Sequence, residues 1–176
     1  MRRMIACLFL IGFGCEAHTE PLVTEGFVNA PVAEVWRVFA TSEGYLQTGV
    51  SQAEVDLRIG GSIRSHHDPR GTLGDEQTLV LDILAYEPER MLALRPRPAP
   101  ASGAQRAALT DTWSVIYFEA SGEDMTHVRI VGLGYGADPD LQPLRERFVE
   151  DNRRMLQQIA QRYWPKCALC EKEAGQ

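Results

Sequence analysis

The chain has 176 residues, a formal net charge of −6, and 44% hydrophobic and 24% charged residues. These proportions are close to those of globular domains, so an intrinsically disordered chain, a collagen-like repeat and a disulfide-dense mini-protein are excluded. A chain of this length is expected to fold as one domain with a sizeable hydrophobic core. Its 24 acidic residues outnumber its 18 basic ones, which argues against a nucleic-acid partner bound through phosphate contacts.

The first residues have the pattern of an export signal. Arg2 and Arg3 precede an apolar run over residues 4–14, which is shorter than the about 20 residues that span a bilayer but suits a secretory signal. Cleavage after Ala17 would release a soluble domain, whereas processing before Cys15 would leave a lipid anchor on that cysteine. We therefore expect a periplasmic or secreted protein, with a lipoprotein or a buried N-terminal strand as the alternatives.

These signals divide the chain into a signal peptide over residues 1–17, a folded domain over 18–164 and a C-terminal tail over 165–176. The tail contains Cys167 and Cys170 as a C-x-x-C pair. An oxidising compartment outside the cytoplasm permits a local disulfide between them. Free thiols are one alternative, and redox or metal chemistry is another. A zinc site would need two further ligands, and a redox pair normally belongs to a βαβ unit.

The first part of the domain predicts one strand followed by short helices. Residues 22–29 have strand character, and Pro31 then suits the first turn of a helix. Apolar residues over 32–39 recur at helical spacing. The segment 41–46 ends this helix and is expected to cap a second short one.

The middle of the domain predicts about six antiparallel strands. Hydrophobic and charged residues alternate over 53–59, so Val55 and Ile59 would share one face of a strand. Glycines at positions 60 and 61 then turn the chain. Further strands are expected over residues 62–67, 77–86, 91–95, 112–119 and 127–135, with a long Pro- and Ala-rich loop over 96–108.

The end of the domain predicts one long amphipathic helix. Asp138 and Pro139 provide an N-cap and a proline in the first turn, which is a typical helix start. A helix with one apolar face must bury that face, so we expect an α+β domain with this helix against an antiparallel sheet. The apolar face carries Leu141, Leu144, Phe148, Met155, Ile159 and Tyr163.

Three local motifs accompany this order of elements: APVAEVW at residues 30–36, DLRIGGSIR at 56–64 and YEPERML at 86–92. With the closing helix, they resemble the SRPBCC superfamily, whose START-like members have the helix-grip fold. The resemblance is strongest to the bacterial proteins similar to the C-terminal domain of the Hsp90 ATPase activator. Members usually carry a tryptophan just before the second strand, where this chain has LQTGV at residues 46–50.

The resemblance implies a curved antiparallel sheet of six to seven strands wrapped around a long C-terminal helix. It also implies two short helices after the first strand and an apolar cavity between the sheet and the long helix. Since voids cost stability, a retained cavity would serve a ligand. On their strand, Trp113 and Tyr117 would share the face opposite to Ser114 and Ile116, and either face could point inward. The predicted cavity lining is Trp36, Phe39, Trp113, Tyr117, Phe148, Met155 and Ile159, with ordinary core packing of these residues as the alternative.

The sequence offers few candidates for catalysis or metal binding. His66 and His67 are adjacent, so on a strand they would point to opposite faces and cannot chelate one metal together. We expect them to be exposed in a hairpin, and we expect Asp68, Asp75 and Glu76 to form a solvated turn. If the domain were an enzyme, His67 or Glu76 at the mouth of the cavity would be the general base. Nucleophile-elbow, P-loop and dinucleotide-binding motifs do not occur in the sequence.

We therefore expect a non-catalytic protein that binds a hydrophobic small molecule or lipid-like ligand, without a metal, a cofactor or a transmembrane helix. Two other functions stay open. The superfamily resemblance implies a cyclase- or hydratase-type enzyme that uses the same cavity. The branch resemblance implies stimulation of an Hsp90-type ATPase, which would require the chain to stay in the cytosol.

Overall fold

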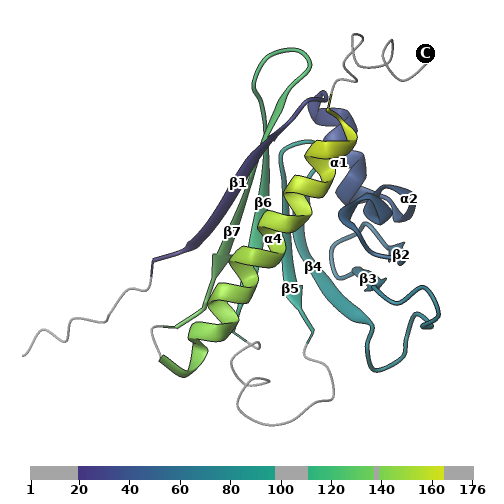
Figure 1. Cartoon of the computed structure of the whole chain (residues 1–176), viewed down its shortest axis with the longest axis vertical. Coiled ribbons are helices and arrows are strands. Elements are labelled where there is room, and N and C mark those ends of the chain that lie inside the picture. The colour runs from purple at the N-terminus through teal and green to yellow at the C-terminus, as the bar shows by residue number, and fades with distance from the viewer. Residues whose placement is uncertain (1–19, 98–110, 137–138, 165–176) are drawn as a thin grey trace, which may run out of the picture.

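The computed structural model describes residues 20–97, 111–136 and 139–164. Seven antiparallel strands form one curved sheet, and the long helix α4 (Gln142–Arg162) crosses one face of it diagonally (Figure 1). This arrangement confirms the α+β helix-grip fold, and the sheet has seven strands. The expected signal peptide, Cys15, Cys167 and Cys170 lie outside the described residues.

The strand order across the sheet is β1-β7-β6-β5-β4-β3-β2, so the first strand pairs with the last one. The two short strands β2 and β3 form the opposite edge. The ladder between β4 and β5 shifts register between Ile83 and Ala85, and an irregularity of this kind increases the local bend of a sheet. The strands are β1 (Leu22–Val28), β2 (Gln52–Val55), β3 (Ser62–His66), β4 (Leu79–Glu87), β5 (Met91–Pro96), β6 (Trp113–Ala120) and β7 (Thr126–Leu133).

Two short α-helices follow β1, as the sequence predicts. Helix α1 (Val32–Ala40) begins after Pro31 and buries Val35 and Phe39. Helix α2 (Ser42–Tyr45) is capped by Thr41, whose hydroxyl accepts a hydrogen bond of 3.0 Å from the backbone N–H of Gly44. A single 3₁₀ turn, η1 (Leu46–Thr48), continues the chain toward β2.

The contact between α4 and β7 identifies the inner face of the sheet. The ring of Phe148 lies so close to Gly132 that a side chain at position 132 would overlap it. Gly132 pairs with Ser114 of β6, so Ser114 points toward the helix. Because side chains alternate along a strand, Tyr117, three positions after Ser114, belongs to the outer face. Trp113, the first residue of β6, lies at the strand end beside the space under α4. The structure thus decides between the two orientations that the sequence leaves open.

Helix α4 is held to the domain by its C-terminal half. Among its described residues, Leu156 and Ile159 are the buried ones, and Ile159 is 0% exposed. Leu144 and Phe148, nearer the start of the helix, are only half-buried. The helix therefore packs closely at one end and stands over a more open region at the other. None of the helices in the described ranges has both the length and the apolar character that crossing a membrane requires.

The strand that the sequence extends to Ile59 is shorter than predicted. Strand β2 ends at Val55, and Ile59 is 70% exposed. The chain turns instead, because the N–H of Gly61 donates to the carbonyl of Arg58 and the N–H of Gly60 donates to Ile83 on β4, both at 2.9 Å. The alternating pattern continues through this turn although the strand does not.

The start of the long helix also differs from the prediction. Pro139 opens a 3₁₀ turn, η2 (Pro139–Leu141), and the α-helix begins only at Gln142, with Pro143 in its first turn. Asp138, the expected N-cap, lies outside the described residues. The two prolines are both compatible with a first helical turn, so the sequence pattern does not distinguish the two starts.

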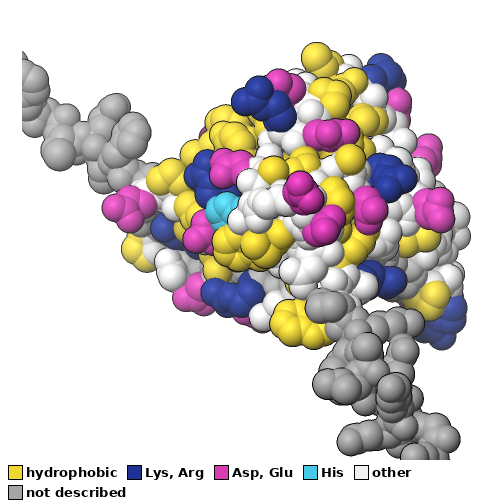
Figure 2. Space-filling view, turned by 90° about the horizontal axis from the view of Figure 1, so that it is seen from above, with side chains coloured by type: hydrophobic (Ala, Val, Ile, Leu, Met, Phe, Trp, Pro, Cys, Tyr) yellow, Lys and Arg dark blue, Asp and Glu magenta, His cyan; other side chains and the backbone are white. Residues whose placement is uncertain are grey.

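Figure 2 shows the end of the molecule that carries the β6–β7 turn and the C-terminal end of α4. Acidic, basic and hydrophobic side chains are interspersed on this face. Neither sign of charge gathers there into one continuous patch.

The uneven packing of α4 predicts an uneven response to truncation. Ile159→Ala removes fully buried atoms and should lower the free energy of unfolding by about 3 kcal/mol. Met155→Ala, one turn earlier on the same helix, removes half-buried atoms and should cost about 1 kcal/mol. Chemical denaturation of the two variants measures the difference, and equal losses would contradict the anchoring of α4 by its C-terminal half.

Candidate functional site

A cleft of about 570 Å³ opens between α4, over residues 144–158, and the inner face of the sheet. Its volume lies within the range of small-molecule sites, roughly 300–1,000 Å³. The α4 side chains that border it, such as Phe148 and Met155, are only half-buried. They therefore leave space between the helix and the sheet. The floor is apolar and comes from five elements, with Phe39 from α1, Leu81 from β4, Leu94 from β5, Ile116 from β6 and Ile130 from β7.

Phe148 and Met155 of α4 line the cleft from the helix side, opposite this floor. The ring of Phe148 lies 5.0 Å from the ring of Tyr135, measured between centroids. It also approaches the backbone of β7 at Gly132, where a Cβ atom would overlap it. The glycine therefore lets an aromatic side chain of α4 lie against the sheet at this end of the cleft.

Hydroxyl groups interrupt the apolar lining. Tyr45 is 6% exposed and lines the cleft, and burial raises the pKa of its phenol to about 12. Burial likewise raises the pKa of Tyr135 to about 12, although a hydrogen bond with Thr112 lowers it in part. The buried Ser65 lines the cleft from β3. Both phenols therefore stay protonated and uncharged near neutral pH, and each can donate a hydrogen bond.

The charged groups of the lining, apart from His67, stand on α4. Arg147, Asp151 and Arg154 follow one another at helical spacing and line the cleft, and the neutral amide of Gln158 continues the row. The Asp151 carboxylate lies 3.4 Å from Nε of Arg147 and 3.8 Å from a guanidinium nitrogen of Arg154. These side chains are more than half exposed, so they form a polar rim along one side of the cleft.

The C-terminal end of the polar rim lies against the backbone of the residue that follows η1. Gly49 has a φ of +96°, and a Cβ at that position would overlap the amide of Gln158. Thr48, Gly49 and Val50 all line the cleft. A small residue here lets the end of the rim approach the backbone.

The structure brings four of the predicted lining residues to the cleft and places three elsewhere. Trp36 packs in the core, 5.4 Å from Phe118 between ring centroids. Ile159 is also core, and Tyr117 lies on the outer face of the sheet under Arg129, whose guanidinium carbon is 4.7 Å from the ring centroid. The residues at the cleft are Phe39, Trp113, Phe148 and Met155, and their role in ligand binding stays a prediction.

Sequence reasoning missed the polar part of the lining. It considered only the apolar face of the last helix, but a stripe of charged residues of that helix also borders the cleft. The available signal was the spacing of Arg147, Asp151 and Arg154, which runs beside the apolar Phe148 and Met155. Of the two candidate bases, His67 lines the cleft, whereas Glu76 does not.

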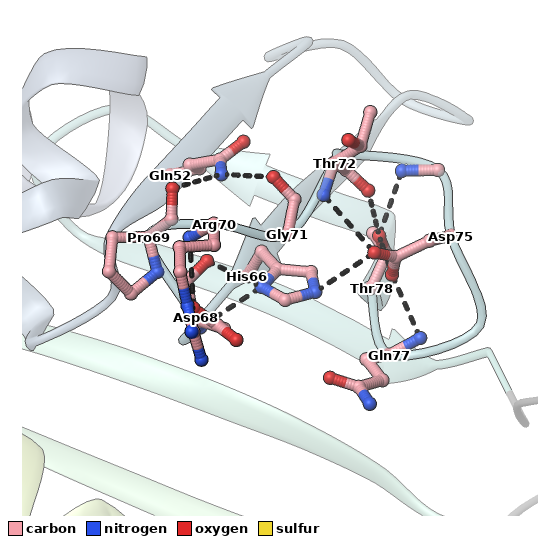
Figure 3. A network of polar contacts seen from close by, with 11 residues as sticks. Gln52, His66, Asp68, Pro69, Arg70, Gly71, Thr72, Asp75, Gln77 and Thr78 are labelled. Carbon is pink, nitrogen blue, oxygen red and sulfur yellow. Dashed lines mark hydrogen bonds and ion pairs between the residues drawn. The ribbon is translucent and has the colours of Figure 1, made fainter.

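His66 points to the other face of β3 and organises the loop that follows (Figure 3). Its Nδ1 lies 3.0 Å from both the N–H and the carbonyl oxygen of Asp68. Nε2 lies 3.2 Å from the Asp75 carboxylate. That carboxylate also accepts the N–H groups of Thr72 and Gln77, at 3.1 and 2.9 Å.

This arrangement corrects the expectation for His66. His66 is 2% exposed instead of lying open in a hairpin, because the loop closes over its ring. Gly71 lies against the ring, where any Cβ atom would overlap it, and the Gln52 amide donates to the carbonyl of Gly71 at 2.7 Å. Asp75 joins this network and stays exposed in the turn, as the sequence predicts. The pair lies on the outer side of β3, so its role is to hold the loop.

Within the part of the chain that the structure describes, no group of three or more His, Cys, Asp or Glu side chains is placed to hold a metal ion. A second hollow, of about 410 Å³, lies on the other side of α4, beside the start of β1. Two guanidinium groups and two carboxylates line it, with no aromatic side chain, and the lining is Leu22, Gln142, Arg145, Glu146, Val149, Glu150 and Arg153.

Comparison with protein-family models and with curated proteins finds no match for the sequence. Solved structures share the fold. Protein MLL2253 from Mesorhizobium loti superposes with a TM-score of 0.62 at 17% identity, over 81% of this chain and 95% of that chain. The Aha1 dimer from Colwellia psychrerythraea gives a TM-score of 0.58 at 10% identity, over 81% of this chain and 97% of that chain.

A third similar structure is the di-domain ARO/CYC protein BexL from the BE-7585A biosynthetic pathway. It superposes with a TM-score of 0.61 at 16% identity, over 81% of this chain and 46% of that chain. At these identities the likeness establishes the shared helix-grip fold. The same fold therefore serves proteins with different names and different chain lengths, and function has to be argued from the site.

The loop that covers His66 should depend on the charge of Asp75. The N–H of Thr72, followed by the N–H of Gln77, the His66 ring and the Thr78 hydroxyl, lowers the pKa of Asp75 below its ordinary 3.8. A lowered pKa means that the stabilisation is present above the ordinary value and is lost as the pH falls below it. Asp75→Asn should therefore accelerate hydrogen exchange at the Thr72 and Gln77 amides severalfold at neutral pH. In the unmodified protein, acidification below the pKa of Asp75 should lower the protection factors of these amides, which compare their exchange rates with the slower intrinsic exchange at the same pH.

The matched control is Glu76→Gln, which removes a charge from the same loop but leaves the His66 network intact. Exchange at the two amides should be unchanged in this variant. Equal acceleration in Asp75→Asn and Glu76→Gln would mean that net charge, and not the hydrogen bonds to Asp75, holds the loop.

Proposed function

We propose that the protein is a non-catalytic binding protein that holds a small, largely apolar molecule in the cleft between α4 and the sheet. The observation that carries this proposal is the cleft of about 570 Å³ with an apolar floor. An unfilled apolar space lowers stability in proportion to its volume, and occupation by a guest would recover contacts that the floor otherwise lacks. The pattern at residues 1–17 supports a place of action outside the cytoplasm.

Catalysis in the same cleft is the second candidate, because the ARO/CYC protein BexL shares the fold and His67 lines the cleft. Two features favour binding. The most buried titratable group of the lining is Tyr45, whose pKa of about 12 makes it a poor acid or base near neutral pH. His67 is exposed at the end of β3, and no carboxylate in the described chain is placed to orient its ring.

Stimulation of an Hsp90-type ATPase is the weakest candidate. Its structural support is the fold shared with the Aha1 dimer at 10% identity. An exported chain would not meet a cytosolic chaperone, so this function and the export signal exclude each other.

The proposal is tested with Nile red, a neutral dye whose fluorescence rises in an apolar site. The protein should bind it, and Met155→Trp should weaken binding at least about tenfold, because the larger side chain occupies the cleft. Cooperative unfolding should be retained, since Met155 is half-buried beside open space. Fluorescence titration and chemical denaturation of the same samples give both results.

The matched control is Met91→Trp, which adds the same side chain on the outer face of β5, where Met91 pairs with Tyr117. Dye binding should be unchanged in this variant. If Met155→Trp unfolds the protein, position 155 is packed core. If instead it binds the dye as well as the unmodified protein does, the cleft is not the site.

A further inference from the structure

The cleft lining has the opposite charge to the chain as a whole. The chain carries a formal charge of −6, whereas the lining contains two arginines against one aspartate and is formally +1 with His67 neutral. The hollow on the other side of α4, with two arginines and two glutamates, is neutral. A positive site in an acidic protein attracts anions locally although the whole molecule repels them.

The two cleft arginines lie close enough on α4 for one carboxylate to contact both of them. Arg147 and Arg154 are seven positions apart, which is about two helical turns, so both residues lie on the cleft side of α4. Asp151 lies between them and contacts both, while Arg154 also contacts Glu150 at 3.4 Å. The arginine side chains are 80% and 61% exposed. Ion pairs this exposed contribute little, so the guanidinium groups remain available to another anion.

Each arginine directly precedes an apolar residue of the cleft. Arg147 is followed by Phe148, and Arg154 by Met155, which lie opposite the apolar floor. The rim and the apolar lining therefore run in parallel along α4. A molecule whose apolar body lies against Phe148 and Met155 would bring a terminal polar group to the two guanidinium groups.

We infer that the ligand is an amphiphile with one carboxylate head, which Arg147 and Arg154 bind at the rim while the apolar body fills the cleft. This inference rests on the proposed function and specifies its ligand class. A guanidinium presents planar paired donors that match the two oxygens of a carboxylate. The buried hydroxyls of Tyr45 and Ser65 lie deeper in the lining and carry no charge, so the head group belongs at the rim.

The test compares decanoate with decanol, which share a chain length and differ in the head group, as competitors of Nile red at pH 8. In Arg147→Gln/Arg154→Gln the affinity for decanoate should fall about tenfold, because two charge-assisted contacts are lost. The affinity for decanol should stay unchanged. Raising the salt concentration should weaken decanoate binding by the unmodified protein and leave decanol binding unaffected.

Arg153→Gln is the matched control, because it removes the same charge from the same helix on the side away from the cleft. It should bind both competitors as the unmodified protein does. Each single variant, Arg147→Gln and Arg154→Gln, is measured as well and replaces the double variant if that one loses cooperative unfolding.

The outcomes separate the two proposals. If decanol displaces the dye and the arginine variants lose no preference for decanoate, the carboxylate inference is wrong and the binding function stands. If Arg153→Gln lowers decanoate affinity as much as the cleft variants do, general charge explains the effect and the inference is again wrong. If the unmodified protein binds neither the dye nor either competitor, the binding function fails and the inference fails with it.

Discussion

The close packing of Leu156 and Ile159 against the inner face of the sheet is the interaction on which the rest of the structure depends. It holds the C-terminal half of α4 in the core. Helix α4 crosses the curved sheet diagonally (Figure 1), and the face of the helix next to these anchors borders the cleft from Leu144 to Gln158. The fold and the cleft thus have one cause, because the residues that stabilise the domain also determine where it stays hollow.

The fold follows from patterns that are strong in this sequence. Period-two and period-3.6 hydrophobic repeats and the turn glycines predict the order of the elements, and the resemblance to the SRPBCC superfamily predicts their arrangement. The prediction fails where the hydrophobic alternation continues past the end of a strand. Ile59 keeps the alternation, although β2 ends at Val55. The prediction also fails at His66, because the loop that buries this side chain depends on contacts with Gly71 and Asp75 that have no sequence period.

The candidate site was predictable only in part. Phe39, Phe148 and Met155 reach the cleft because apolar residues of α1 and α4 point toward the sheet in any helix-grip fold. Tyr117 could not be placed, since the two faces of its strand are both apolar and only the pairing through β7 decides between them. A polar stripe beside an apolar one has the same sequence pattern whether it faces open solvent or the mouth of a cleft. The distinction needs the position of the neighbouring strands.

Hydrogen exchange along α4, with and without a bound guest, tests the central claim most directly. Amides over residues 156–162 should exchange only through global unfolding, because Leu156 and Ile159 anchor this part of the helix in the core. Amides over 144–151 should exchange faster, through local opening. Adding Nile red should slow the second group and leave the first unchanged. Uniform protection along the whole helix, with no change on addition of the dye, would show a solidly packed interface and contradict the account.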